Sequence, residues 1–300
     1  MRKVLKWLGI GLGVLVGLLL LALAGVLGYG EIAYGRTHDR PIYPITADTS
    51  PEGIAHGEYL VRAVMACADC HAPEGSSEMI GTSEQLSVGP IRATLVFPNL
   101  TPDEETGLGA WTDAEIARAI REGLSPDGRE LRIMPSSNFH RLSDADTAAI
   151  IGYLRSQEPV RSELPERSAN AFAKAMFVLP LGLPEAYGPA ITQPQNAPEP
   201  GTLEYGAYLT SLAGCRDCHK SDFSGGRLPF SESDVPPAPN LTSGGSLGDW
   251  SEADFVKTLH TGIRPDGSIL TEDMPWRVYT RMTDDDLGAI YQYLMSLPAR

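Results

Sequence analysis

An apolar stretch without a single charged side chain runs from Trp7 to Tyr29. A helix over this stretch is about 34 Å long, at about 1.5 Å per residue, and therefore crosses a hydrocarbon core of about 30 Å. Basic residues precede the stretch, at Arg2, Lys3 and Lys6. Because basic residues stay on the cytoplasmic side of a membrane, the pattern predicts a signal-anchor transmembrane helix over residues 1–30, with the rest of the chain exported.

A cleaved signal peptide is the alternative for this segment. Ala22-Leu23-Ala24 resembles a small-residue cleavage site. However, the apolar run continues past it, and the apolar region of a typical signal is shorter, about 7–15 residues. Both alternatives export residues 30–300, and residues 31–49 are expected to form a linker.

Beyond residue 50, apolar positions recur at helical spacing, in an order of segments that occurs twice. The predicted helices of the first copy are 54–66, 111–122 and 143–157; those of the second begin at Leu203, Ser251 and Thr283. No segment alternates between apolar and polar residues well enough to predict a strand. The sequence therefore predicts an all-α fold.

Capping residues mark where several of these helices begin. Thr112 and Glu115 have the spacing of a capping box, and so do Ser251 and Asp254 in the second copy. The closing helices are expected to start at Ser143 and Thr283, each with an aspartate three residues later.

Direct sequence matches support an internal duplication. They pair Gly57-Glu-Tyr-Leu with Gly206-Ala-Tyr-Leu, Pro98-Asn-Leu-Thr with Pro239-Asn-Leu-Thr, and Met134-Pro with Met274-Pro. They predict two tandem domains, over residues 50–158 (the first copy) and 201–300 (the second copy). Residues 159–200 between them are rich in proline. This linker contains apolar residues such as Phe172 and Phe177, so we expect it to pack on one or both domains rather than to form a free tether.

The charge distribution excludes one class of function. The chain carries 24 Lys and Arg against 38 Asp and Glu, a net charge of −14. A nucleic-acid binder needs basic patches, so no nucleic-acid partner is expected. Acidic residues cluster at 103–105 and 284–286. The first cluster is a candidate for steering a basic redox partner, although solvated acidic surfaces are common.

All four cysteines lie in two Cys-x-x-Cys-His motifs: Cys67, Cys70 and His71, and Cys215, Cys218 and His219. Two thiols three residues apart on a helical turn can form thioethers to the two vinyl groups of one haem, and the adjacent histidine ligates its iron. The motifs therefore predict two covalently bound haem c groups. A thioredoxin-like dithiol, a zinc site and exported disulfides are the alternatives, but none of them explains the repeated histidine.

Each haem iron then needs a sixth ligand or an open position. Met134 and Met274 occupy equivalent places after a Pro-Asp-Gly turn, and both are followed by proline. A thioether is a soft ligand that favours ferrous iron, so both methionines are predicted axial ligands. His140 and Met282 are rivals, but their counterparts in the other copy are Thr280 and Leu142, which cannot act in the same way.

These motifs resemble class I c-type cytochrome domains. The order Pro-Asn-Leu-Thr, Trp, Pro-Asp-Gly and Met-Pro is similar to that in the cytochrome c subunits of membrane-bound quinoprotein alcohol dehydrogenases and flavoprotein gluconate or sorbitol dehydrogenases. The resemblance implies that the carbonyls of Pro98 and Pro239 accept hydrogen bonds from the ligand histidines. It also implies that Trp111 and Trp250 lie near haem propionates.

Together these features predict a dihaem cytochrome c that is anchored in a bacterial inner membrane, with its haem domains on the periplasmic side. It would pass single electrons and would not be an enzyme itself. The expected donor is a membrane dehydrogenase, through its large subunit, or a quinol-oxidising complex; the expected acceptor is a terminal oxidase or a small soluble cytochrome. The alternative is a dihaem enzyme, such as a peroxidase or a thiosulfate-oxidising cytochrome, which requires one iron with an open position.

Overall fold

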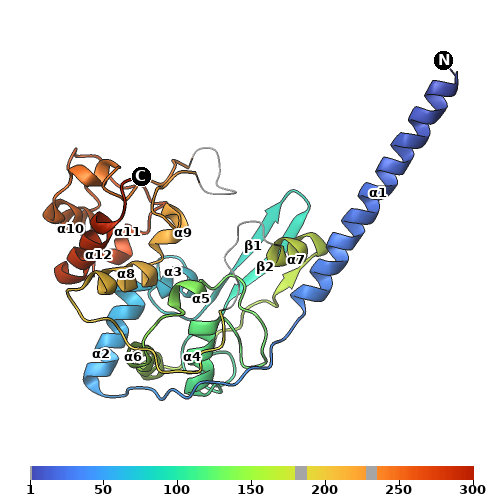
Figure 1. Ribbon diagram of the computed structural model, residues 1–300. Helices are drawn as coiled ribbons and strands as arrows, with labels where there is room; N and C mark the ends of the chain where they lie inside the picture. Colours follow the sequence, from blue (N-terminus) through green and yellow to red (C-terminus); the bar gives the residue numbers. More distant parts are fainter. Residues whose placement is uncertain (1, 180–187, 228–234) are drawn as a thin grey trace. The chain divides into compact units, whose positions relative to one another are not determined.

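The computed structural model describes residues 2–179, 188–227 and 235–300 (Figure 1). Parts of the predicted linker and of the predicted second domain, residues 180–187 and 228–234, lie outside the described residues. The described chain divides into two units. The first unit contains residues 2–38, 83–96 and 164–179, and the second contains the rest, including both cysteine motifs.

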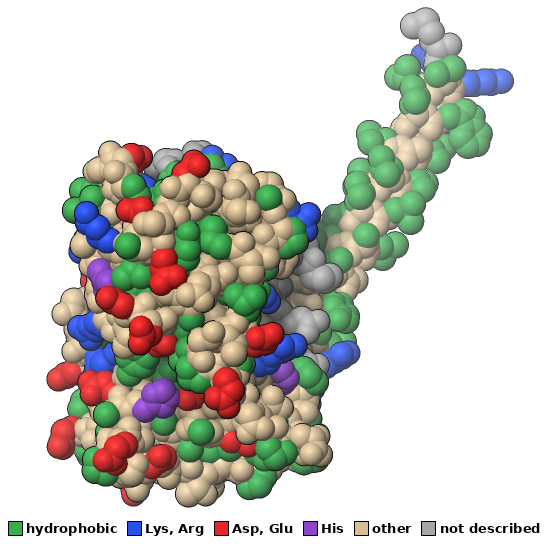
Figure 2. Space-filling view, turned by 60° about the vertical axis from the view of Figure 1, so that its left-hand side comes forward, with side chains coloured by type: hydrophobic (Ala, Val, Ile, Leu, Met, Phe, Trp, Pro, Cys, Tyr) green, Lys and Arg blue, Asp and Glu red, His purple; other side chains and the backbone are tan. Residues whose placement is uncertain are grey.

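The first unit begins with helix α1 (Arg2–Tyr34), whose apolar side chains are exposed along its length (Figure 2). The helix is long and apolar enough to cross a membrane, a test that a signal sequence also passes. It ends at Tyr34, so the first residues of the predicted linker 31–49 continue the helix.

Helix α7 (Ala171–Val178) packs against the C-terminal end of α1. The contact is close, because a Cβ atom added to Gly30 would lie 2.6 Å from the Cα of Ala175. Lys174 also pairs with Glu31 at 2.5 Å. This part of the linker 159–200 therefore packs on α1 rather than on a haem domain.

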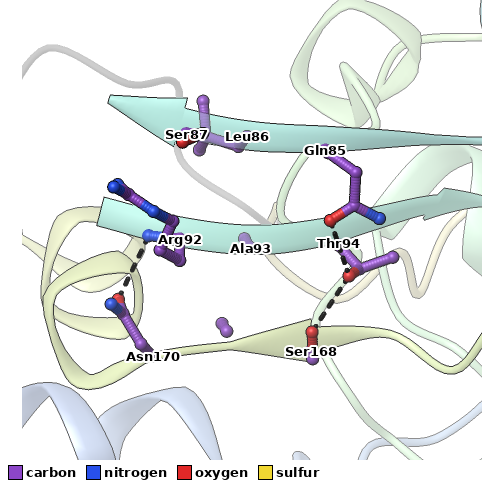
Figure 3. A pocket seen from close by; sticks show the side chains of 9 residues that line it. Gln85, Leu86, Ser87, Arg92, Ala93, Thr94, Ser168 and Asn170 are labelled. Atoms are coloured by element: carbon purple, nitrogen blue, oxygen red, sulfur yellow. Dashed lines mark hydrogen bonds between the residues drawn. The ribbon is translucent and has the colours of Figure 1, made fainter. Parts of the chain in front are cut away.

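A three-stranded sheet in the order β1-β2-β3 contradicts the all-α prediction. Its strands are β1 (Thr82–Val88), β2 (Ile91–Phe97) and β3 (Ser168–Ala169), with β2 and β3 antiparallel. Figure 3 looks into the surface hollow that they border, where Ser168 donates to Thr94 at 3.0 Å and Thr94 to Gln85 at 3.2 Å. The β-branched residues and the Gly89-Pro90 turn between β1 and β2 favour a hairpin even though the apolar alternation is weak.

The second unit contains two series of helices in the same order. The first is α2 (Pro51–Tyr59) with the π-helical turn Leu60–Val64, α3 (Cys67–His71), α4 (Asp113–Glu122), α5 (Ser136–Phe139) and α6 (Asp144–Ser156). The second is α8 (Leu203–Leu212), α9 (Cys215–His219), the 3₁₀ turn Ser246–Asp249, α10 (Glu252–Thr261), α11 (Trp276–Tyr279) and α12 (Asp284–Ser296).

The predicted helix starts are confirmed. Thr112 and Ser251 both form complete capping boxes. Ser143 and Thr283 cap the closing helices through the amide N–H groups three residues later, at 2.9 and 3.2 Å. Each cap satisfies a backbone donor that the first helical turn leaves without an intrahelical partner.

A glycine lies at the crossing of the first and last helices of each copy. A Cβ atom on Gly57 would lie 2.0 Å from the carbonyl oxygen of Ala149 on α6, and one on Gly206 would lie 2.2 Å from that of Ala289 on α12. Such distances are below van der Waals contact. Only glycine therefore allows α2 to cross α6, and α8 to cross α12, at this separation.

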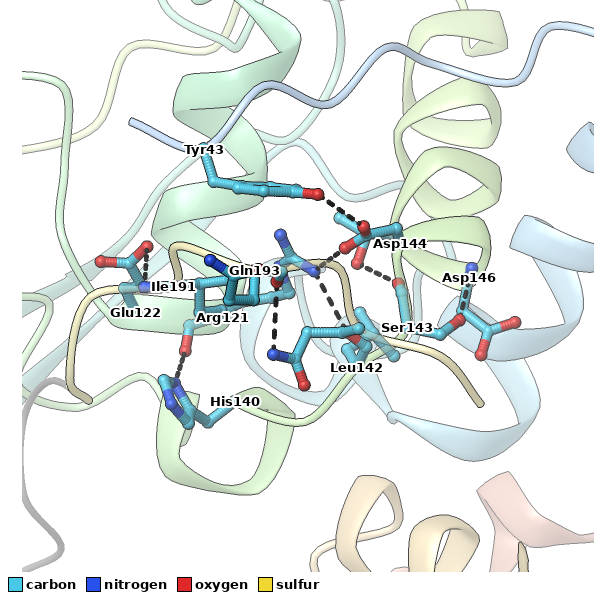
Figure 4. Close-up of polar contacts among 12 residues, drawn as sticks. Tyr43, Arg121, Glu122, His140, Leu142, Ser143, Asp144, Asp146, Ile191 and Gln193 are labelled. Carbon is cyan, nitrogen blue, oxygen red and sulfur yellow. Dashed lines mark hydrogen bonds and ion pairs between the residues drawn. The ribbon is translucent and has the colours of Figure 1, made fainter. Parts of the chain in front are cut away.

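The segments that flank the first copy pack against it, as the apolar linker residues predicted. Figure 4 shows Tyr43 donating to the carboxylate of Asp144 at 3.1 Å. The N–H of Asp144 donates to the carbonyl of Gln195 at 2.9 Å, and the N–H of Ile191 donates to Glu122 at 3.3 Å. The start of α6 and the end of α4 therefore fix both segments.

We expect Gly57→Ala and Gly206→Ala to destabilise the protein because each methyl group forces two packed helices apart. Overpacking of this kind costs about 1–3 kcal/mol of unfolding free energy. Denaturant unfolding of the haem-loaded protein measures the effect, with Glu58→Ala, an exposed neighbour on α2, as the control. Equal stability of the glycine variants and the control would show that the crossing adapts.

An ion pair on the first copy predicts a pH-dependent stability. His56 on α2 lies 2.6 Å from Asp146 on α6, and this hydrogen bond, opposed by burial, raises the pKa of His56, with a smaller contribution from the charge of Asp286. Burial of Asp146 opposes its ionisation, but the hydrogen bonds from His56, Tyr208 and Ser143 outweigh it and lower its pKa.

The raised pKa of His56 means that its protonated form stabilises the fold below a pH of about 6.5, and that this stabilisation is lost as the pH rises through the folded-state pKa. The lowered pKa of Asp146 sets the acid limit, because its contribution is lost as the pH falls below about 3.9. We expect His56→Gln to lower the melting temperature most at pH 5–6 and less at pH 9. A difference that does not change with pH would contradict the charged pair.

Candidate haem sites

Each cysteine motif forms a one-turn helix that begins after a left-handed residue. Ala66 precedes α3 with a φ of 53°, and Gly214 precedes α9 with a φ of 67°. The left-handed conformation costs a non-glycine residue about 1–2 kcal/mol, so the surrounding fold imposes it on Ala66. The two cysteines of each motif are three residues apart and therefore lie on one face of a turn.

The cysteine thiols are not those of a reactive dithiol. All four are free, and burial raises the pKa values of Cys67 and Cys215 to about 12. A redox dithiol or a thiolate metal ligand needs the opposite shift, because the thiolate is the nucleophile and the ligand. Among the described residues, no group of three or more His, Cys, Asp or Glu side chains could hold a metal ion. The zinc and dithiol alternatives therefore lose support.

Both motif histidines make the same hydrogen bond. Nδ1 of His71 lies 2.8 Å from the carbonyl oxygen of Pro98, and Nδ1 of His219 lies 2.8 Å from that of Pro239. A carbonyl can only accept, so Nδ1 carries the proton and Nε2 keeps its lone pair. Burial lowers the pKa values of both rings, which favours the neutral form that ligates iron. The proline carbonyls implied by the family resemblance are confirmed.

An asparagine holds each of these prolines in place. Asn99 is fully buried, accepts from the N–H of Thr101 at 2.9 Å and donates to the carbonyl of Val160 at 2.7 Å. Asn240 accepts from the N–H of Thr242 at 2.8 Å and donates to the carbonyl of Arg300 at 2.9 Å. Each asparagine ties the loop behind its histidine to the residues that follow the closing helix.

The two methionine loops share one conformation. The N–H of Ser136 donates to the carbonyl of Met134 at 2.8 Å, and the N–H of Trp276 donates to that of Met274 at 2.7 Å. Both methionines are half-buried against the core. A short antiparallel bridge around the Pro-Asp-Gly turn precedes each loop, at 124–130 and 263–269. The two methionines therefore occupy equivalent positions in the two copies.

The rival ligands are engaged elsewhere. Nδ1 of His140 lies 2.9 Å from the carbonyl of Arg121 (Figure 4), and Gly188 covers the ring so closely that a Cβ there would lie 2.5 Å from it. Met282 is 3% exposed in the core, as is its counterpart Leu142 at 0%. Met282 is therefore a packing residue in the position that leucine fills in the first copy.

The acidic cluster at 103–105 is partly consumed by internal contacts. Asp103 accepts from the N–H and hydroxyl of Thr106, both at 2.7 Å, while Glu105 pairs with Arg161. Glu104, between them, is exposed to solvent. The cluster therefore presents less free charge to a partner than its sequence implies.

The donor set of each copy fits a covalently attached haem. It supplies two thiols on one helical turn, a neutral imidazole with a free Nε2, and a thioether in a separate loop. For Trp111 and Trp250, the place near the haem propionates stays a prediction.

Comparisons with known proteins agree with this chemistry. The family model for cytochrome c matches residues 54–158. Over 92% of its length, the chain is 32% identical to a subunit of the nicotinate dehydrogenase of Pseudomonas putida, of which it covers 24%, and 30% identical to the cytochrome c subunit of alcohol dehydrogenase (quinone) of Gluconobacter oxydans, of which it covers 60%. It is also 30% identical to a diheme cytochrome c-type protein of Cereibacter sphaeroides, over 78% of the chain and 82% of that protein.

The fold and the sites thus define a c-type haem protein, and the chain belongs to the cytochrome c family. It carries covalently bound haem c and transfers electrons, as a redox carrier rather than as a catalytic enzyme. It spans less than two thirds of the length of the first two relatives.

We expect Asn99→Ala to raise the reduction potential of the haem attached at His71. Loosening the Pro98 carbonyl weakens the hydrogen bond that makes the imidazole a stronger donor to ferric iron. A redox titration measures the shift, with Asn170→Ala, which removes the N-cap of α7, as the control. An unchanged potential would show that the carbonyl is held without Asn99.

Proposed function

We propose that this protein is a membrane-anchored dihaem cytochrome c that passes single electrons between redox proteins. The observation that supports it most strongly is the repetition of one local geometry, the histidine bonded to a proline carbonyl at 2.8 Å, in both copies. The relative from Cereibacter sphaeroides is named as a diheme cytochrome. Two class I domains, over residues 50–158 and 201–300, would each hold one haem.

In this proposal the haems supply the one-electron chemistry, and the side chains bind and tune them. The first haem would be attached through Cys67 and Cys70, with His71 and Met134 as axial ligands. The second would be attached through Cys215 and Cys218, with His219 and Met274 as axial ligands. The proline carbonyls orient the imidazoles, and the soft thioethers favour the reduced state. No side chain needs to act as an acid, base or nucleophile.

The proposed location follows from α1. As an uncleaved anchor in a bacterial inner membrane, it would hold both haem domains at the periplasmic surface. Several relatives are named as cytochrome subunits of dehydrogenases, including those for fructose in Gluconobacter japonicus and gluconate in Pantoea cypripedii. We therefore propose a dehydrogenase or a quinol-oxidising complex as the electron donor, and a terminal oxidase or a small cytochrome as the acceptor.

A dihaem peroxidase or thiosulfate-oxidising enzyme would need one iron with an open or labile position. The two methionine loops have the same backbone turn and the same burial. This equivalence favours two closed irons and therefore electron transfer.

The proposal predicts two thioether-linked haems per chain. Mass spectrometry of the denatured protein should show the added mass of two haems, and replacing Cys215 and Cys218 together by alanine should leave one. The same double replacement at Cys67 and Cys70 should leave the other. A single haem in the unaltered protein would contradict the dihaem proposal.

The proposal also predicts that each methionine closes one iron. Met134→Ala and Met274→Ala should each allow carbon monoxide to bind one reduced haem and lower its potential, because a soft ligand is lost. Met282→Leu is the matched control, since the first copy has leucine at that position. If a methionine variant stayed closed to carbon monoxide, that methionine would be a packing residue.

A further inference from the structure

The two copies share one hydrophobic core and meet at buried polar contacts. The cluster of buried apolar residues is continuous from Leu60 and Ile150 in the first copy to Leu209 and Leu287 in the second. At this contact lie two tyrosines that the duplication makes equivalent, Tyr59 of Gly57-Glu-Tyr-Leu and Tyr208 of Gly206-Ala-Tyr-Leu.

Tyr59 reaches from α2 to the start of α12 in the second copy (Figure 1). Its hydroxyl donates to the carboxylate of Asp286 at 2.5 Å and accepts from the N–H of Thr283 at 3.2 Å. Thr283 is the N-cap of α12, and Asp286 follows it by three residues. One side chain of the first copy therefore engages both ends of the first turn of α12.

Tyr208 makes the same contacts in the opposite direction. Its hydroxyl donates to the carboxylate of Asp146 at 2.5 Å and accepts from the N–H of Ser143, the N-cap of α6, at 3.0 Å. Because Tyr59 and Tyr208, and likewise Asp286 and Asp146, are repeat equivalents, the two contacts are related by an approximate two-fold axis between the copies. We call these two contacts the tyrosine clamp.

Each aspartate of the clamp also binds a residue of its own copy. Asp146 pairs with His56, and Asp286 accepts from Tyr205 at 3.0 Å. His56 and Tyr205 occupy equivalent positions three residues before the clamp tyrosines. Both aspartates are 8% exposed, so their carboxylates depend on these donors in place of water.

The helices that carry the cysteine motifs lie at the same contact. Asn138 on α5 donates to Asp217 on α9 at 2.6 Å, which joins the methionine loop of the first copy to the cysteine motif of the second. Tyr279 on α11 donates to the carbonyl of Ala213 at 2.7 Å, just before α9. The charge of Asp69 on α3 also reaches Tyr279, where burial and then nearby Cys215 raise the tyrosine's pKa. Both cysteine motifs therefore border the contact between the copies.

We propose that Tyr59 and Tyr208 are positioning residues for electron transfer between the two haems. This inference rests on the proposed dihaem function. The clamp fixes the start of each closing helix to the opposite copy, and each closing helix is packed on the helix that leads into its own cysteine motif. The clamp therefore fixes the distance and the angle between the two haem planes.

The test is the double variant Tyr59→Phe with Tyr208→Phe, which removes two hydroxyl groups and keeps the rings. Two haems held in a fixed arrangement give a paired positive and negative signal in Soret circular dichroism. We expect the full-length protein to show this signal and the double variant to lose most of it, with slower electron exchange between the haems. The ordinary absorption spectrum, which reports iron ligation, should not change.

Tyr205→Phe is the matched control, because it removes a hydrogen bond to Asp286 from within the same copy. It should keep the paired signal. Asp286→Asn provides a second variant that keeps an acceptor for Tyr59, and it should weaken the signal less than the double variant does.

A double variant with both haems bound and an unchanged paired signal would overturn the inference while leaving the dihaem function intact. A control variant that loses as much signal as the double variant would also overturn it, since the inter-copy bonds would then have no special role. Haem mass is measured on the same samples. One haem per chain would instead refute the proposed function itself.

Discussion

The hydrogen bond between a motif histidine and a proline carbonyl is the contact around which each copy is organised. It requires a loop to return behind the cysteine helix, and a buried or half-buried asparagine holds that loop to the chain beyond the closing helix. The closing helix must then cross the first helix closely, which only a glycine at the crossing allows. The orientation of one imidazole ring thus constrains residues from the beginning to the end of each copy.

The duplication lets the two copies stabilise one another. Their buried apolar residues form one cluster, and the first turn of each closing helix binds a tyrosine of the other copy. A helix start exposes backbone N–H groups that need acceptors, and here the hydroxyl of the opposite tyrosine serves one of them while donating to the nearby aspartate. Two similar folds thereby become one unit.

Much of this arrangement was predictable from local sequence. The capping residues Thr112 and Ser251 fix helix starts through contacts within four residues, and the spacing of the cysteine motifs specifies their chemistry. The hairpin of β1 and β2 was missed because its strands alternate weakly, although Gly89-Pro90 marks its turn. The pairing of Tyr59 with Asp286 joins positions 227 residues apart, and no local pattern specifies such a contact. Likewise, only the folded chain shows that α7 packs on α1.

The central claim is that the chain holds two closed irons, each between a histidine and a methionine. Ferric haem with this ligand pair has a weak near-infrared charge-transfer band from sulfur to iron, and its intensity per chain counts such irons. Quantified on the full-length ferric protein against its measured haem content, the band should correspond to two histidine–methionine haems per chain. An intensity that accounts for only one, or a band that is absent, would contradict the account.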